Sequence, residues 1–238
     1  MEPAVDLRAA VTLLGRFPAL AGVDLRVDAG EVVLLRGPNG AGKSTLLRTC
    51  AGLLAASSGR AHVLGHDLAD GRERRAVRRR VALLGHATGL YDDLTVADNV
   101  AFWGRAGGAD DADVAAALAA LGLDGRLASV AVARLSAGQR RRTALACVVA
   151  RRAELWLLDE PHAGLDAAGR DLLDHLVRDA AAAGATVLLA SHELDRAAAL
   201  AARHVTIAGG VVVEDSRTAA PAPPTIESLP VAVAGSSV

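Results

Sequence analysis

Short apolar runs alternate along the chain with longer stretches of helical character. Residues 32–35, 81–85, 155–158 and 186–190 are almost continuously apolar, which is the pattern of strands buried on both faces. Helical stretches are predicted after the first run to about residue 54, over much of 94–152, and over about 168–183. Strands that alternate with helices predict an α/β fold with a mostly parallel sheet covered on both sides.

The two ends of the chain have a different character. Residues 5–14 and 23–27 have the alternating or mixed pattern of strands, separated by the turn-like Gly15 and Pro18. Residues 216–238 are rich in Pro, Ala and Ser, so we predict a disordered tail there. We therefore expect one folded domain over residues 1–215. Within it, glycines near 107–108 and 122–125 divide the helical part at about 93–152.

Composition narrows the class of protein. A net charge of −1 argues against general nucleic-acid binding, which requires a basic surface, so no nucleic-acid partner is expected. No uncharged apolar stretch reaches the roughly 18 residues of a membrane span, and the start lacks the pattern of a signal peptide. We therefore expect a cytoplasmic chain. Cys50 and Cys147 are too few and too far apart for a metal site or a disulfide framework, and are predicted to be buried thiols.

A glycine-rich loop follows the first apolar run. Residues 37–44 match the pattern G-x-x-x-x-G-K-[ST], and Lys43 is the single lysine of the chain beside 25 arginines. Backbone N–H groups of such a loop and the start of the next helix surround a phosphate. Lys43 would reach the β- and γ-phosphates, and Ser44 would bind Mg²⁺. The predicted nucleotide-binding residues here are Gly37, Pro38, Asn39, Gly40, Ala41, Gly42, Lys43, Ser44 and Thr45.

Two acids end the apolar run 155–158. Asp159 would join Ser44 at Mg²⁺, and Glu160 would stand beside the attacking water. A solvated acidic turn after a strand is the alternative interpretation. The phosphate loop alone does not separate ATPases, GTPases and small-molecule kinases.

Three further motifs separate them. Residues 135–139 read LSAGQ, residues 159–166 read DEPHAGLD, and His192 follows the apolar run 186–190. With the phosphate loop, their order and spacing over about 5–215 resemble the ATPases of ABC transporters. The resemblance implies a P-loop NTPase of ABC type, with an antiparallel β-subdomain and an inserted α-helical subdomain. It also implies ATP and Mg²⁺ as cofactors.

The resemblance assigns further roles residue by residue. Two copies, or one copy and a related ATPase, would pack head to tail, because each chain has a single set of motifs. The nucleotide held by Lys43 of one copy would be contacted by Ser136, Gly138 and Gln139 of the other. Glu160 would polarise the water and His192 would contact the γ-phosphate. Asp166 would carry information across the interface.

Two positions depart from the family pattern. His86 stands where the family has a glutamine that joins Mg²⁺ to the transporter contact, so either His86 alters this contact or it only packs at the strand end. The aromatic residue that stacks on adenine is also displaced. Either Phe17 stacks on the base, or Leu14 makes a weaker apolar contact. The arginine clusters at 72–80, 140–142 and 151–152 are predicted to be solvated helix faces.

Three functions remain open: an ATPase subunit that docks on separate integral-membrane permease subunits, a soluble ABC ATPase, and a nucleotide-sensing module. The first is favoured, because a second cassette, coiled coils and zinc cysteines are absent from the sequence while Glu160 and His192 are present. It predicts a peripheral location on the cytoplasmic face of the cell membrane. The stretch Leu84-Gly85-His86 is similar to the ATP-binding subunits of haem exporters of cytochrome c maturation. Export of a drug, a lipid or another small molecule is the alternative.

Overall fold

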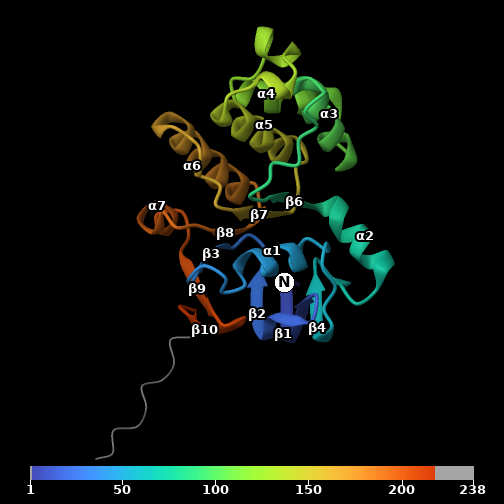
Figure 1. Cartoon of the computed structure of the whole chain (residues 1–238), viewed down its shortest axis with the longest axis vertical. Coiled ribbons are helices and arrows are strands. Elements are labelled where there is room, and N and C mark those ends of the chain that lie inside the picture. Colours follow the sequence, from blue (N-terminus) through green and yellow to red (C-terminus); the bar gives the residue numbers. More distant parts are fainter. Residues whose placement is uncertain (1, 218–238) are drawn as a thin grey trace, which may run out of the picture.

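The computed structural model describes residues 2–217 of the chain (Figure 1). Almost all of the predicted tail, 218–238, lies outside the described residues. Within the described range, no helix is long and apolar enough to cross a membrane.

The centre of the molecule is a six-stranded sheet with the strand order β10-β9-β3-β8-β7-β6. Five strands run parallel, and β10 pairs antiparallel with β9 at one edge. The mostly parallel sheet predicted from the apolar runs is confirmed, since those runs form β3, β6, β7 and β8. The strands are β3 (Val32–Arg36), β6 (Val81–Leu84), β7 (Leu155–Asp159), β8 (Thr186–Ala190), β9 (Arg203–Ala208) and β10 (Val211–Asp215).

Both faces of this sheet are buried, which explains why its strands are continuously apolar. Successive side chains of a strand point to opposite faces. In β7, Trp156 and Leu158 belong to the apolar core on the helical side, whereas Leu155 and Leu157 belong to the core shared with the second sheet. The central sheet therefore separates two hydrophobic cores and holds the ends of its strands in fixed positions.

The second sheet is antiparallel, with the order β2-β1-β4-β5, and corresponds to the predicted β-subdomain (Figure 1). Its second strand begins at Phe17, earlier than the predicted residue 23, because Gly15 adopts φ 64° and lets Leu14 pair directly with Phe17. Pro18 is tolerated because β2 is an edge strand. The strands are β1 (Pro3–Leu14), β2 (Phe17–Asp28), β4 (Ser58–Val63) and β5 (His66–Asp67).

Helices cover the central sheet, and α3, α4 and α5 form a separate group beyond β6 and β7 (Figure 1). Polar side chains cap their starts: Thr95 caps α3, while Asp110 and Ser136 form capping boxes at α4 and α5. The α-helices are α1 (Lys43–Cys50), α2 (Gly71–Arg80), α3 (Val96–Ala106), α4 (Asp111–Ala120), α5 (Ala137–Ala150), α6 (Ala167–Ala182) and α7 (Leu194–Ala198). Two 3₁₀ turns, η1 (Gly125–Ser129) and η2 (Val132–Arg134), join α4 to α5.

Candidate functional site

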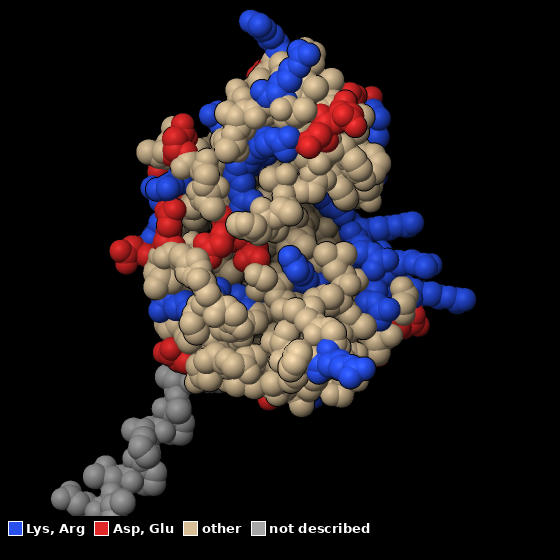
Figure 2. Space-filling model, viewed as in Figure 1, with Lys and Arg blue, Asp and Glu red and all other residues tan. Residues whose placement is uncertain are grey.

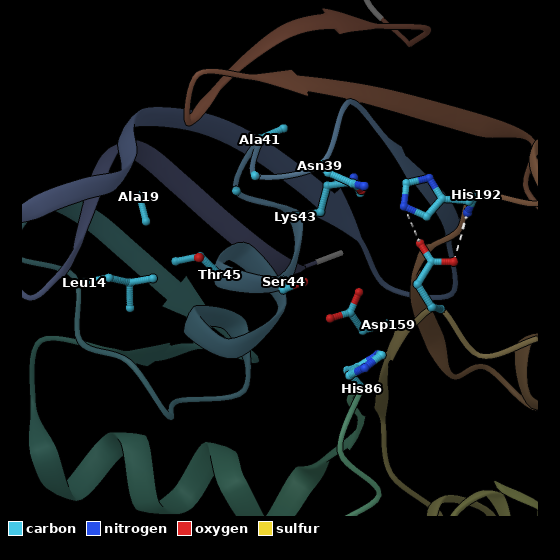
Figure 3. Close-up of a pocket in the computed structure, with 13 residues that line it drawn as sticks. Leu14, Ala19, Asn39, Ala41, Lys43, Ser44, Thr45, His86, Asp159 and His192 are labelled. Atoms are coloured by element: carbon cyan, nitrogen blue, oxygen red, sulfur yellow. Dashed lines mark hydrogen bonds and ion pairs between the residues drawn. The ribbon is translucent and has the colours of Figure 1, made fainter. Parts of the chain in front are cut away.

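A cavity of about 490 Å³ lies beside the loop that follows β3, between the β1–β2 hairpin and the carboxyl ends of central-sheet strands (Figure 3). Its walls come from segments that are far apart in the sequence: the β1–β2 hairpin, the loop 37–42, the start of α1, the loop after β6, the end of β7 and the loop after β8. The lining residues are Leu14, Ala19, Asn39, Gly40, Ala41, Gly42, Lys43, Ser44, Thr45, His86, Asp159, Glu160 and His192.

The loop between β3 and α1 has the backbone of an anion site. Gly37, Gly40 and Gly42 all have positive φ angles, of 136°, 77° and 111°, which side chains with a Cβ rarely adopt. Gly42 is the N-cap of α1 and offers no side-chain acceptor to the first turn of the helix. The free N–H groups and the partial positive charge at the start of α1 therefore face the cavity and favour a phosphate.

Lys43 begins α1 and is 8% exposed. Its Nζ donates hydrogen bonds to the backbone oxygens of Gly37, at 2.7 Å, and Pro38, at 3.0 Å. No carboxylate forms an ion pair with this ammonium in the described part of the chain, so its charge is balanced only by carbonyl dipoles. A phosphate in the cavity would supply the missing negative charge.

Asp159 is a buried carboxylate at the last position of β7, 8% exposed, that lines the same cavity as Ser44 (Figure 3). Within residues 2–217, no side chain or backbone N–H donates a hydrogen bond to this carboxylate, so its oxygens are available to a ligand. The same residues contain no cluster of three or more His, Cys, Asp or Glu side chains that could hold a metal alone. This arrangement suits Mg²⁺, which is typically held by one or two protein oxygens together with substrate phosphates.

Glu160 and His192 are in direct contact at the edge of the cavity (Figure 3). The backbone N–H of His192 donates to Oε2 of Glu160 at 3.0 Å, and Nε2 of His192 lies 3.5 Å from Oε1. Oε1 is buried and accepts no hydrogen bond from the described residues. Since the His192 side chain is 56% exposed, it is the more movable partner, and its displacement would open Oε1 to the cavity.

The two positions that depart from the family pattern, His86 and the adenine-stacking position, differ in how the structure places the predicted residue. His86 lines the cavity, as does Asp159. Phe17 does not: it is 79% exposed, whereas Leu14 and Ala19 form the apolar wall near the β1–β2 hairpin. Of the two alternatives, the structure places Leu14 at this wall.

The other predicted nucleotide contacts lie away from the cavity of their own chain. Ser136 accepts a hydrogen bond from the N–H of Gln139, whose side chain in turn accepts one from the N–H of Ser136. Gly138 packs beside the backbone of Gly164, where an added Cβ would lie 3.5 Å from its oxygen. Asp166 caps α6. Within a single chain, the LSAGQ motif at residues 135–139 therefore does not line the cavity formed by the phosphate loop.

The prediction for the arginine clusters is only partly correct. Arg72, Arg75 and Arg79 of α2 are exposed, and Figure 2 shows a group of basic side chains projecting from this edge of the molecule. Arg141, in contrast, is 6% exposed, and Arg151 donates hydrogen bonds to three backbone carbonyls. These two side chains face inward because α5 packs against the sheet, which the local pattern of arginines does not reveal.

A buried histidine was not assigned a role from the sequence. His162, in the loop after β7, is 1% exposed, and its Nε2 lies 2.9 Å from Oδ1 of Asp174 on α6. Asp174 also accepts a hydrogen bond from Arg196 of α7 at 2.5 Å. The loop that follows Glu160 is therefore tied through α6 to the helix that follows His192. The only signal in the sequence is a histidine inside the DEPHAGLD run.

Comparisons with known proteins agree with this geometry. A family profile described as ABC transporter matches residues 20–163. The cytochrome c biogenesis ATP-binding export protein CcmA of Rhodopseudomonas palustris is 41% identical over 189 residues, covering 79% of this chain and 90% of that protein. The protein of the same name from Ruegeria sp. is 42% identical over 180 residues, covering 75% and 79%.

Solved structures give the same result. The dimeric post-hydrolysis state of the ATP-binding cassette MJ0796 bound to ADP and Pi has a TM-score of 0.81 and 25% identity, covering 89% of this chain and 97% of that one. An ATP-binding subunit of an ABC transporter has a TM-score of 0.80 and 28% identity, covering 89% of both chains. The fold predicted from the motif order is confirmed, and the chain belongs to the ABC transporter family, as an ATP-binding domain.

Proposed function

We propose that this chain is the ATP-hydrolysing subunit of an ABC transporter, which dimerises on ATP and drives transport through separate integral-membrane permease subunits. One observation carries the proposal: Lys43 at the start of α1 lines the same cavity as Asp159 and Glu160, which stand together at the end of β7, more than 100 positions later in the chain. Phosphoryl transfer to water requires a cation that binds the phosphate, a carboxylate that binds the metal, and an acidic residue beside them. Lys43, Asp159 and Glu160 supply these groups in that order.

The phosphate loop and Lys43 bind and orient the phosphates, while Leu14 and Ala19 supply apolar contact for the base. Ser44 and Asp159 would hold Mg²⁺, which neutralises charge on the β- and γ-phosphates when bound. Asp159 fits this role because its carboxylate is buried and otherwise unpaired among the described residues. His86 lines the same cavity, where it would take the place of the family's glutamine.

Glu160 is proposed as the general base that orients and deprotonates the attacking water. Its Oε2 is already held by the N–H of His192, which leaves Oε1 as the acceptor for that water. Nε2 of His192 lies 3.5 Å from Oε1 and covers it. A γ-phosphate that attracts the His192 side chain would uncover Oε1 and at the same time gain a hydrogen bond that stabilises developing charge.

The position of the LSAGQ motif supports the proposed dimer. Ser136, Gly138 and Gln139 do not line the cavity of their own chain, so they would contact the nucleotide held by a second copy or a related ATPase. Gly138 lies beside the backbone of Gly164, which supports a position for the loop that ends at Asp166 at the same interface. A two-fold axis would then make two equivalent sites, each complete only in the dimer.

We further propose that the transported molecule is haem destined for cytochrome c maturation. Support comes from the relatives named as cytochrome c biogenesis ATP-binding export proteins and from the Leu84-Gly85-His86 stretch. The subunit would then work at the cytoplasmic face of the cell membrane, bound to its permease. Export of another small molecule, a drug or a lipid is the alternative.

The catalytic proposal is tested with the variant Glu160→Gln, which keeps the shape of the side chain and removes its basicity. Glu154→Gln is the matched control, because Glu154 precedes β7 at its other end and its side chain is 54% exposed. Steady-state ATP hydrolysis and the fraction of dimer in ATP and Mg²⁺ are measured for both variants and the wild type. We expect Glu160→Gln to lose about a hundredfold or more in kcat, as expected for loss of general-base catalysis, and to accumulate as an ATP-bound dimer.

Equal hydrolysis by the wild type and Glu160→Gln would show that Glu160 is not the base. A wild type that binds ATP without hydrolysing it, alone and with its permease, would favour the nucleotide-sensing function. The cargo is tested in the host by deleting the gene and staining c-type cytochromes for covalent haem. Loss of the stain, restored by the wild type and not by Glu160→Gln, supports haem export, whereas an unchanged stain contradicts it.

A further inference from the structure

Arg141 lies in the second turn of α5 and is one of the most buried charged residues of the described chain, at 6% exposure. Its guanidinium donates to four backbone oxygens: Nη1 to Gly85 at 3.0 Å, Nε to Pro161 at 3.3 Å, and Nη2 to Asp159 at 3.2 Å and Glu160 at 2.5 Å. One side chain therefore joins the end of β6, the end of β7 and the start of α5.

No carboxylate forms an ion pair with Arg141 among residues 2–217. The positive charge is therefore stabilised by the carbonyl dipoles and by the nearby acids of the site. Burial lowers the pKa of Arg141, and the nearby Asp159 and Glu160 oppose this effect. An arginine remains charged under such conditions. Burying a charge in this way is unfavourable unless the hydrogen bonds are retained, so the four carbonyls and the guanidinium hold one another in place.

The backbone at Glu160 needs such support. Glu160 has φ 48°, a left-handed conformation that is unfavourable for a residue with a Cβ. Residues in such conformations persist where surrounding contacts hold them, and they cluster at functional sites. The N–H of Glu160 is held by Ala190, and its carbonyl by Arg141 and by the N–H of Ala163. Only Arg141 among these three contacts comes from outside the central sheet and the loop itself.

The helix that carries Arg141 also carries Ser136 at its N-cap, about one turn away. In the proposed dimer, Ser136 contacts the nucleotide of the partner, while Glu160 acts on the nucleotide of its own chain. The position of α5 thus affects both sites, and the guanidinium is the direct link from this helix to the backbone of Glu160.

We propose that Arg141 is a positioning residue that sets the carboxylate of Glu160 for hydrolysis according to the position of α5. The inference rests on the proposed function and extends it to a residue that touches neither nucleotide nor water. Arg141 does not line the cavity, so its loss acts on the hydrolytic step and not on ATP binding. A displacement of a catalytic group by about 1 Å can reduce a rate by about a hundredfold.

The chain offers a matched control in Arg151, at the C-terminal end of the same helix. Its guanidinium also donates to three backbone carbonyls, of Val81, Trp103 and Arg78, and none of them belongs to the cavity. Arg141→Lys and Arg151→Lys therefore remove similar hydrogen bonds from similar surroundings. Only Arg141→Lys removes a hydrogen bond to the backbone of Glu160.

Steady-state ATP hydrolysis is measured for both variants, with binding of a fluorescent ATP analogue and far-UV circular dichroism as checks of folding. We expect Arg141→Lys to lower kcat by about tenfold to a hundredfold, with KM for ATP within about twofold of the wild type. Arg151→Lys should keep the wild-type kcat per folded molecule. Equal losses in both variants, or a loss that appears in KM alone, would overturn the proposal.

Chemical rescue provides a second test that does not depend on the lysine variant. Arg141→Ala leaves space where a guanidinium ion can bind, so low, non-denaturing guanidinium should raise its kcat, while Arg151→Ala should show no gain. Absence of rescue together with wild-type kcat in Arg141→Lys contradicts the role of Arg141. The proposed function fails separately, if the wild type does not hydrolyse ATP or if Glu160→Gln hydrolyses it equally well.

Discussion

The first glycine of the phosphate loop offers a sharp test of how the fold constrains the site. Gly37 directly follows β3, where Arg36 pairs with Thr206 of β9. Its φ angle is 136°, and a Cβ added to it would lie 2.0 Å from the backbone oxygen of Ile207. We therefore predict that Gly37→Ala destabilises the protein even without nucleotide, because the neighbouring strand requires a glycine here whether or not a phosphate is bound.

The size of the effect has two parts. The backbone conformation costs a residue with a Cβ on the order of 1–3 kcal/mol. The contact with Ile207 adds about 1–3 kcal/mol, because the clashing oxygen belongs to a strand and cannot rotate away as a side chain can. We expect the free energy of unfolding to fall by about 3 kcal/mol or more.

Gly40→Ala is the matched control. Gly40 belongs to the same loop and has φ 77°, but a Cβ there would meet nothing within 4 Å. Only the backbone term applies, so the loss should be about 1–2 kcal/mol. Urea denaturation of both nucleotide-free variants, followed by circular dichroism, gives the comparison. Equal free energies of unfolding for the two variants would refute the reasoning, because the contact with Ile207 would then cost nothing.

Two further predictions concern ionisable groups. Hydrogen bonds from Arg203 lower the pKa of Asp215 below its ordinary value of 3.8, so Asp215→Asn should cost about 1–2 kcal/mol of stability at pH 7. This difference should shrink in urea titrations as the pH falls below 3.8, and a pH-independent difference would contradict the assignment. Burial raises the pKa of Cys50 and of Cys147 to about 12, so neither thiol should react with Ellman's reagent at neutral pH until the protein is unfolded. Rapid labelling of the folded protein would show that these helices open.

Several elements could be predicted because their signal is local. The four apolar runs became buried strands, since burial on both faces of a parallel sheet requires continuous apolar sequence. The phosphate loop was recognisable because glycines must stand at fixed positions to direct N–H groups toward one anion. In contrast, β4, with the sequence SGRAHV, and the short β5 have no such pattern: the first three residues of β4 are exposed and both residues of β5 are half-buried. Strands of an antiparallel sheet need not be buried on both faces.

The sequence by itself determined the order of the motifs, which predicts a phosphate loop, a metal-binding acid and a base for the site. Tertiary structure decided which residues meet. Arg141 reaches Gly85, 56 positions away, and Leu14 rather than Phe17 lines the cavity. The physical reason is that local sequence determines backbone conformation and the faces of an element, whereas a buried hydrogen bond between distant segments depends on how those elements pack together.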